Sequence, residues 1–568
     1  MIEIFFYSYL VSLHIYICGY LFFYIIIDKK FNERSNIFEL FFYGSFILSF
    51  TALFLNFFVS LSKFINTILF FLPFIFILFK LNKYLIKRII ISSFPISLLL
   101  MLTLSYDGTY RPDAGSYHLP YISILNENKI LIGINNIHFR FGHTSIIQYF
   151  SAIYNNIIFD EVGITIPNGL IFCNFVGYCI YEIFNKKNKN IVKTFIFLFL
   201  SFVLFRVNRY SDFGNDAPAN ILFFYLIIES LKDNNFILKL KKIIFASTFI
   251  FLNKVTLLIA FLIPIFYIFK NFKFKKLINK ITIFSVLFLF CYTAKNILIS
   301  GCLIFPVEQT CVKQLFWYDK ESDRASNAIN ARLENESWTK GWMDQKGERK
   351  IYSNYLKNFN WVKSWLHSEG KKILKKLTPF FLYLFILFII VIVFEKRNNK
   401  LESRHTKLSY HYYLCLFVSF LGSIVWFLKF PVFRYGYGYL ISLIIVLSII
   451  KIKNYKILFA DEILLKSFKY LIIFLILGVS LKNINRISKG IKNKSDPWPN
   501  IYSSNITNKK KENLKIIKNE DIIFYKSKKG ECYYSKSPCT HFFNGNDFSL
   551  AEINIKNYKG YKVYYFTK

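Results

Sequence analysis

Long apolar segments follow one another along most of the chain, and short polar segments rich in lysine separate them. A helix needs about 20 apolar residues to cross a hydrocarbon core about 30 Å thick. Several segments are shorter than this, so flanking tyrosine or lysine side chains are expected to reach the interface. The pattern predicts an all-α polytopic membrane protein with about 12 spanning helices. The segments lie near residues 4–27, 37–60, 67–79, 89–106, 162–184, 191–206, 217–231, 281–298, 377–394, 408–428, 439–450 and 468–484.

The stretch 243–269 differs from the others because both of its ends are flanked by lysine-rich segments. Both flanks are therefore expected on the same side of the membrane. The polar triplet Leu252-Asn253-Lys254 divides it into two runs of about ten residues, each about 15 Å long as a helix. We therefore predict a re-entrant hairpin whose tip, at Lys254, reaches the middle of the membrane. Non-helical backbone at that depth requires protein or water around it, so the tip should lie under a polar cavity.

Charge in the loops predicts the orientation of the chain. One set of alternate loops carries 29 lysines and arginines, whereas the other short loops hold only four, Lys63, Arg209, Lys429 and Arg434. Cytoplasmic loops are the lysine- and arginine-rich ones. The N-terminus, the segments 107–161 and 299–376, and the tail from 485 onward are therefore expected outside the cytoplasm. The predicted domains are a polytopic domain over 1–484 and a small extracytoplasmic domain over 485–568.

The composition excludes the first function that the charge suggests. The 568 residues include 72 Lys+Arg and 34 Asp+Glu, a formal net charge of +38, which in a soluble domain indicates nucleic-acid binding. However, 54% of the residues are hydrophobic and 20% aromatic, far from a soluble domain. Much of the positive charge belongs to the lysines and arginines of the predicted cytoplasmic loops. We therefore expect membrane lipids, and no nucleic acid, as partners.

The nine cysteines divide by their surroundings. Five lie in apolar segments, where a thiol behaves as a small apolar group: Cys18, Cys173, Cys179, Cys291 and Cys415. The other four lie in predicted extracytoplasmic segments, where disulfides form. The neighbouring pairs Cys302–Cys311 and Cys532–Cys539 are the simplest of three possible connectivities. The tail around the second pair should contain strands such as Asp521–Tyr525 and Tyr561–Phe566.

Polar residues with possible chemical roles are concentrated in the predicted outer segment 106–143. A solvated loop is the simplest interpretation, but the segment is also rich in Tyr, Phe and Ile, so it should pack on the membrane surface. Polar groups held there must find partners. A metal site built from His138, His143 and an aspartate is a second alternative. The residues concerned are Asp107, Arg111, Asp113, His118, His138, Arg140 and His143.

Further charged residues are predicted at the same face. Asp212 and Asp216 lie in a short outer loop, Lys295 lies near the outer end of its helix, and Arg434 follows Pro431. Such cations can extend to lipid headgroups. Lys254 is less easily explained in this way, since a charge near the membrane centre costs about 3 kcal/mol and usually faces a cavity or a partner. Acids and cations that converge on one outer cavity suit a substrate that carries a phosphate in the membrane.

Several of these segments resemble a large family of bacterial multi-pass membrane proteins that is grouped with glycosyltransferases of the GT-C structural class. The similarity is most specific in Asp113-Ala114-Gly115-Ser116-Tyr117-His118-Leu119-Pro120 and in Gly133 to Ser145, which contains Asn-Ile-His-Phe-Arg-Phe-Gly. Weaker similarity covers Asp212–Pro218, Lys295-Asn296 with Ser300–Pro306, Phe430–Gly438, Trp498-Pro499, Cys532 and Pro538–Thr540. The resemblance thus extends over nearly the whole chain.

The resemblance implies a polyprenyl-phosphate sugar donor, a lipid-linked or surface glycan acceptor, and a place in the bacterial cytoplasmic membrane. It also implies an acidic catalytic residue in an early outer loop, with Asp113 as the best match and Asp107 as the competitor. Two features depart from the usual GT-C layout: three extra helices precede the acidic loop, and the loop lacks an adjacent acidic pair. No nucleotide cofactor and no metal are implied. We expect catalytic roles for Asp113, Asp107 and His118, and substrate binding by Arg434, Lys295, Lys254, Asp216, His138 and Arg140.

Other functions remain open from the sequence. A polymerase of lipid-linked oligosaccharides, or a flippase-like transporter of such lipids, also requires outer cations and a polar intramembrane site. A transporter often has repeated halves, and we find no repeat. A non-catalytic component of polysaccharide assembly is the third alternative. Five tryptophans of the loop 307–376 could either stack on sugars or belong to an interfacial belt: Trp317, Trp338, Trp342, Trp361 and Trp365.

Overall fold

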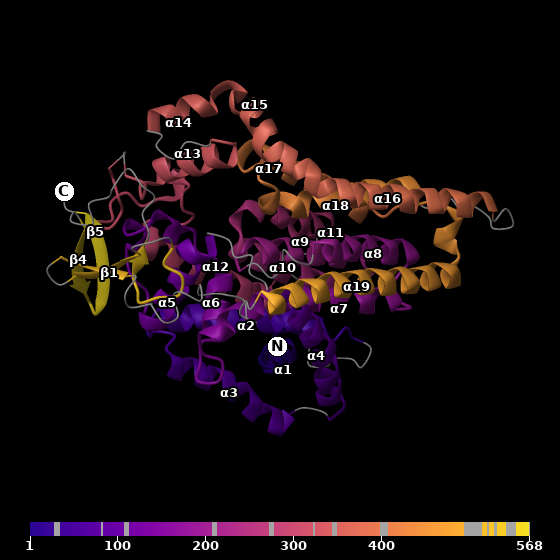
Figure 1. Ribbon diagram of the computed structural model, residues 1–568, viewed down its shortest axis with the longest axis horizontal. Helices are drawn as coiled ribbons and strands as arrows, with labels where there is room; N and C mark the ends of the chain where they lie inside the picture. The colour runs from indigo at the N-terminus through magenta and orange to yellow at the C-terminus, as the bar shows by residue number, and fades with distance from the viewer. Residues whose placement is uncertain are drawn as a thin grey trace.

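In the computed structural model, each apolar segment predicted from the sequence coincides with a helix (Figure 1). The structure describes residues 1–27, 35–80, 83–106, 113–206, 213–233, 235–271, 278–321, 324–342, 349–397, 407–493, 514–519, 522–527, 531–540 and 553–566. Within these residues, nine helical segments are long and apolar enough to cross a membrane, and three apolar helices are shorter. The helices that coincide with the twelve predicted segments are α1 (Ile2–Phe22, continued by η1, Phe23–Ile27), α2 (Glu39–Asn56), α3 (Lys63–Lys80), α4 (Lys83–Leu104), α7 (Ile166–Phe184), α8 (Asn190–Phe205), α9 (Asp216–Leu231), α12 (Lys280–Ser300), α16 (Lys371–Arg397), α17 (Tyr410–Lys429), α18 (Phe433–Ile452) and α19 (Asp461–Lys492).

The predicted hairpin is longer on its first side than the sequence indicated. Its first helix, α10 (Phe236–Asn253), has 18 residues rather than about ten, because Lys239, Lys241 and Lys242 lie inside the helix and not in a loop. The second side consists of η7 (Val255–Phe261) and α11 (Leu262–Asn271). Lys254, which follows this helix, forms an ion pair with Asp216, the residue that begins α9.

Short helices cover the end of the bundle at which α9 begins, which we call the site end. They are η2 (Ala114–His118), α5 (Leu119–Glu127), η3 (Ile134–Asn136), η4 (Phe139–His143), α6 (Ile146–Ala152) and η5 (Asp160–Thr165) from one segment. From a later segment come η9 (Glu308–Thr310), α13 (Ala328–Thr339), α14 (Arg349–Leu356), η10 (Lys357–Phe359), α15 (Trp361–Trp365) and η11 (Leu366–Gly370); η12 (Lys456–Phe459) joins α18 to α19. The described part of the first segment, from Asp113 to Thr165, is largely buried. It is not a solvated loop.

The tail after α19 forms two small sheets beside the site end (Figure 1). In the first, β1 (Leu514–Asn519) pairs antiparallel with β2 (Ile522–Ser527), and β2 pairs parallel with β3 (Cys539–Thr540). The second is an antiparallel hairpin of β4 (Ile553–Tyr558) and β5 (Tyr561–Phe566). Both neighbouring cysteine pairs, Cys302–Cys311 and Cys532–Cys539, are disulfides. The helix α19 continues to Lys492, beyond the domain boundary that we placed at 484.

Hydrogen bonds attach the tail to the segment that follows Asp113. The backbone N–H of Tyr533 donates to the carbonyl of Gly115 at 2.8 Å, and the backbone of Ile132 bonds on both sides to residues of β5, at 3.0 and 2.9 Å. Gly133 has a positive φ of 68°, and a Cβ there would lie 2.1 Å from the Tyr564 carbonyl oxygen. Only a glycine lets the two backbones approach this closely.

A second set of charged residues is buried at the opposite end of the bundle, where α2 begins and α7 and α9 end. Lys242 lies 2.5 Å from Glu39 and 3.1 Å from Glu229, and Lys232 lies 2.7 Å from Glu229 and 3.0 Å from Glu182. We call these five residues the far cluster. The loop-charge pattern counts Lys232 and Lys242 among the cytoplasmic loop residues, but both are buried, at 5% and 6% exposed. Lys232 does follow α9 directly, whereas Lys242 lies inside α10, where Glu39 and Glu229 of other helices pair with it.

Candidate active site

Four charged residues that are far apart in the sequence form one ion-paired group, which we call the Arg434 cluster. The guanidinium of Arg434 lies 2.6 Å from Asp113 Oδ2 through Nη2 and 3.4 Å from Asp216 Oδ2 through Nε. The other carboxylate oxygen of Asp216 pairs with the ammonium of Lys254. The side chains are partly exposed, at 10% for Lys254, 19% for Arg434 and Asp216, and 25% for Asp113. The cluster is therefore neither sealed in the core nor freely solvated.

Helix ends place three of the four residues. Asp216 is the first residue of α9, Asp113 directly precedes η2, and Lys254 directly follows α10. Acids are favoured at helix N-termini and cations at C-termini. Arg434 lies in the first turn of α18, where the helix dipole is unfavourable for a cation, so its two carboxylate partners stabilise it there.

One buried asparagine joins the two helices that carry Asp216 and Arg434. The side-chain amide of Asn220 donates to the carbonyls of Asp216, at 2.8 Å, and of Arg434, at 3.1 Å. Its oxygen accepts the N–H of Gly438 at 2.7 Å. All of these bonds involve backbone groups at the beginnings of α9 and α18. They fix the separation of the two helices at the point where Arg434 meets Asp216.

Arg140 lies beside the cluster, with its guanidinium between aromatic rings. Its guanidinium carbon is 5.3 Å from the ring centres of both Tyr117 and Phe139. Its Nε is buried, and the guanidinium makes no hydrogen bond or ion pair with any residue in the described ranges. Arg140 is near enough to act electrostatically on Asp113 and on Glu334 of α13. An arginine with free N–H donors in a half-buried site is able to bind an anion.

The electrostatic surroundings set the ionisation of the acids. Burial alone raises the pKa of the Asp113 carboxyl, but the positive charges of Arg434 and Arg140 lower it to about 2. Asp113 is therefore ionised at any physiological pH. Burial raises the pKa of the Glu334 carboxyl, against the opposing charge of Arg140. Sequence reasoning missed Glu334, because nothing in its local sequence indicates that α13 lies over the outer segment.

His118 is neutral at neutral pH. Burial lowers its pKa to about 4, although Asp113 and Asp216 act in the opposite direction. Its Nδ1 lies 3.1 Å from the side-chain amide of Gln148 in α6. Gln148 is a second residue that sequence reasoning missed.

The two histidines of the alternative metal site have protein partners. Nδ1 of His138 accepts the backbone N–H of Arg140 at 3.1 Å, so His138 caps η4. Nε2 of His143 lies 3.2 Å from the side-chain amide of Asn335, and burial lowers the pKa of His143 to about 3. Groups of three or more metal-ligating side chains are absent from the residues that the structure describes.

Lys295 is separate from the Arg434 cluster. It is completely buried, donates to the hydroxyl of Thr144 at 2.5 Å, and faces the ring of Tyr292 at 4.1 Å. It has no ion pair with any described residue, so the phosphate-binding role expected from the sequence stays a prediction. The competing acid Asp107 and the charged residues Arg111, Arg209 and Asp212 lie outside the described residues.

Of the five tryptophans, Trp338 is the exposed one that lies against the cluster. It is 43% exposed, and its ring centre is 5.7 Å from the guanidinium carbon of Arg434. Trp361 and Trp365 are buried, and Trp365 donates to the carbonyl of Pro431 at 2.6 Å, in the turn before α18. The ring of Tyr435 covers the ammonium of Lys254 at 3.8 Å. Aromatic faces thus surround the cations of the site.

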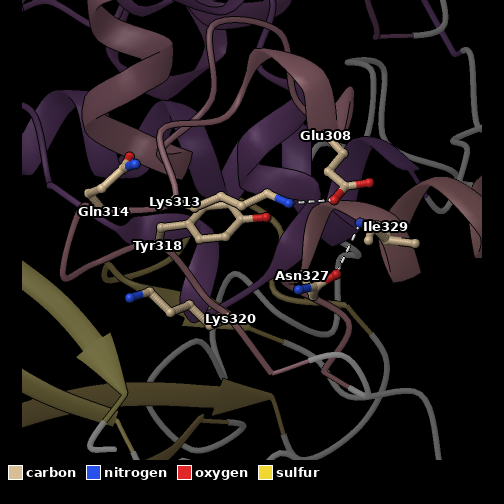
Figure 2. Close-up of a pocket in the computed structure, with 7 residues that line it drawn as sticks. All are labelled: Glu308, Lys313, Gln314, Tyr318, Lys320, Asn327 and Ile329. Carbon is tan, nitrogen blue, oxygen red and sulfur yellow. Dashed lines mark hydrogen bonds and ion pairs between the residues drawn. The ribbon is translucent and has the colours of Figure 1, made fainter.

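A pocket of about 400 Å³ lies in the later segment of the site end, and Figure 2 shows its lining. Lys313 forms an ion pair with Glu308 at 2.6 Å across it, and Asn327 caps the beginning of α13. The ring of Tyr318 packs against Gly301, where a positive φ of 78° turns the chain out of α12. None of the predicted catalytic or substrate-binding residues contributes to the lining, which consists of Glu308, Lys313, Gln314, Tyr318, Lys320, Asn327 and Ile329.

A family model described as Domain of unknown function (DUF8201) matches residues 1–441. The chain belongs to this family. The DUF8201 region contains the whole Arg434 cluster, Arg140, His118 and the far cluster, whereas the strands of the tail follow it. No curated protein and no solved structure matches the chain.

Proposed function

We propose that the chain is a glycosyltransferase of the GT-C type, which transfers a sugar from a polyprenyl-phosphate donor to a lipid-linked or surface glycan acceptor. The transfer takes place at the outer leaflet of the bacterial cytoplasmic membrane. The observation that carries the proposal is Arg140, whose side-chain donors have no partner among the described residues and lie beside the ion-paired acids Asp113 and Asp216. Guanidinium groups bind phosphate through paired N–H donors, so Arg140 and Arg434 together are suited to the donor phosphate.

The proposed reaction inverts the anomeric carbon. Asp113 accepts the proton of an acceptor hydroxyl while the hydroxyl oxygen attacks that carbon. The bond from the carbon to the phosphate oxygen breaks, and the phosphate leaves with the electron pair. Arg140, Arg434 and Lys254 stabilise the charge that develops on the leaving phosphate.

Donor binding makes Asp113 a stronger base in this scheme. A carboxylate with a pKa of about 2 is a weak base, and a general base works best when its pKa is near the operating pH. The donor phosphate competes with Asp113 for Arg434, which weakens the ion pair and raises the pKa of Asp113. The acid is then activated only when the donor is present. Trp338, next to Arg434, offers a face on which a sugar ring could stack.

The test is the Asp113→Asn variant in a knockout strain, with surface polysaccharide as the readout. The amide keeps the volume of the carboxylate but cannot accept a proton, so activity should fall by roughly 10²- to 10⁴-fold. Asp160→Asn is the matched control, because Asp160 belongs to the same segment and forms an exposed ion pair with Lys63. It should keep full activity.

Parallel variants identify the base if Asp113 is not the one. Full activity in Asp113→Asn would exclude it as the base, and Asp216→Asn, Glu334→Gln and Asp107→Asn would then be compared. Full activity in all four of these variants would contradict the proposal that the protein is a glycosyltransferase. Lipid extracts of the knockout separate the alternatives: a transferase mutant accumulates acceptor that lacks one sugar, whereas a flippase mutant accumulates complete units on the cytoplasmic leaflet.

A further inference from the structure

The side chains of His118 and Gln148 meet inside the site end with almost no solvent contact. The Nδ1 atom of His118 is 3.1 Å from Nε2 of Gln148, and the two residues are 4% and 1% exposed. The orientation of the Gln148 amide decides which atom of this pair carries the hydrogen. That orientation is determined by the beginning of α6.

Gln148 is part of a capping box at the N-terminus of α6. The hydroxyl of Ser145 accepts a backbone N–H of the first turn, and Oε1 of Gln148 accepts the backbone N–H of Ser145 at 2.8 Å. A backbone N–H can only donate, so the atom that faces it must be the amide oxygen. The NH₂ group of Gln148 then faces His118 and donates to it, which leaves Nδ1 of His118 without a hydrogen.

A neutral imidazole carries its single hydrogen on the other nitrogen. His118 Nε2 is therefore the protonated atom, and it lies on the side of Gly214, where a Cβ would be 3.7 Å away. Gly214 is two residues before Asp216, so Nε2 faces the beginning of α9. Nε2 has no hydrogen-bond partner within the described residues. Among those residues, it is a donor that is left unused.

We propose that Gln148 is a positioning residue that holds His118 as the Nε2–H tautomer, so that His118 donates a hydrogen bond to a phosphate oxygen of the substrate. The identity of that oxygen rests on the proposed function, whereas the tautomer does not. His118 is in this way a further N–H donor toward the phosphate, beside Arg140, Arg434 and Lys254, and it is not the base. Asp113 keeps that role.

The tautomer is measurable by ¹⁵N NMR of the full-length protein, labelled at histidine and reconstituted in lipid. Subtraction of the spectrum of His118→Gln assigns the signals of His118. At pH 7 we expect an Nδ1 shift typical of an unprotonated nitrogen and an Nε2 shift typical of a protonated one. A protonated Nδ1 would overturn the inference.

The decisive variant is Gln148→Glu, because Ser-x-x-Glu is itself a capping box and should preserve α6. One carboxylate oxygen still accepts the N–H of Ser145, but the other can only accept, so the hydrogen of His118 should move to Nδ1 or the ring should become doubly protonated. Ser145→Ala is the control, since it disturbs the same helix end and leaves the amide of Gln148 in place. An unchanged spectrum in Gln148→Glu would contradict the proposal. If this variant does not accumulate, Gln148→Met, which has no donor, should give a mixture of tautomers.

The role toward the substrate is tested by surface polysaccharide in the same strains. Where the hydrogen moves to Nδ1, Gln148→Glu should lose activity by roughly 10²- to 10³-fold, because one N–H donor to the developing negative charge is removed. A reversed tautomer with full activity would overturn the positioning role. Full activity in Asp113→Asn would instead overturn the proposed base and leave the tautomer assignment standing.

Discussion

The two arginines of the site differ in how they are held, and the difference predicts what each contributes. Arg434 pairs with two carboxylates, whereas the guanidinium of Arg140 lies between aromatic rings and has no hydrogen-bond partner among the described residues. Arg434 therefore has a structural role in addition to a binding role. Arg140 has only a binding role.

Replacing each arginine by glutamine should separate the two roles. Arg434→Gln leaves Asp113 and Asp216 without their shared cation, so the free energy of unfolding should fall by about 1–3 kcal/mol, less than for a fully buried pair because the groups are partly exposed. Arg140→Gln should leave stability within about 1 kcal/mol. Thermal unfolding of the purified proteins in detergent measures both.

Binding should respond in both variants. Each should bind polyprenyl phosphate more weakly than the wild type, which native mass spectrometry in detergent can measure. An Arg140→Gln protein that binds the lipid as tightly as the wild type would remove Arg140 from the phosphate site.

Single residues show where sequence reasoning reached its limit. It placed Asp113, Asp216, Lys254 and Arg434 on one face, because loop charges predict which segments share a side of the membrane. It could not pair them, since the pairing depends on Asn220 and on helix ends that meet only in three dimensions. Glu334, Gln148 and Trp338 carry no local signal that distinguishes them from other polar or interfacial residues.

Among the helices, α9 and α10 form a pair with an ion pair near each end. Lys254 meets Asp216 at the site end, and Lys242 meets Glu229 in the far cluster. Asp216 and Glu229 are 13 positions apart on α9, or about 20 Å. The apolar part of each helix is predictable because hydrophobicity is a local property. The full length of α10 was not predictable from the sequence. Lys242 is acceptable inside a buried helix only because Glu39 and Glu229 of other helices pair with it.

We expect Lys242→Met to destabilise the protein strongly. The change leaves Glu39 and Glu229 buried without this cation, which typically costs about 3–5 kcal/mol. Lys189→Met is the matched control, since Lys189 forms an exposed pair with Asp233 and exposed pairs contribute at most about 1 kcal/mol. Thermal unfolding in detergent is the measurement, and equal losses in the two variants would contradict a stabilising role for the far cluster.

At the scale of the whole molecule, the loop charges predict which side of the membrane carries the site. A reporter fused after Lys407 should be cytoplasmic, and one fused after Lys568 should be outside. A cytoplasmic C-terminus would also place the cluster on the cytoplasmic side, since the tail is bonded to the segment after Asp113. Such a result would be incompatible with transfer at the outer leaflet. The attachment of the tail to residues 115–133 was not predictable, because it joins segments about 400 positions apart that have no shared sequence signal.

That attachment has a consequence for how the protein is made. Gly115 and Ile132 are synthesised before most of the membrane helices, but their backbone partners Tyr533 and Tyr564 belong to the tail that follows α19. During synthesis, the membrane helices are inserted long before the segment after Asp113 can acquire these hydrogen bonds. Ribosomes that stop anywhere before the tail would leave an inserted protein whose site segment lacks them. The segment after Asp113 is therefore expected to acquire these hydrogen bonds only after the tail has left the ribosome and has crossed to the same side.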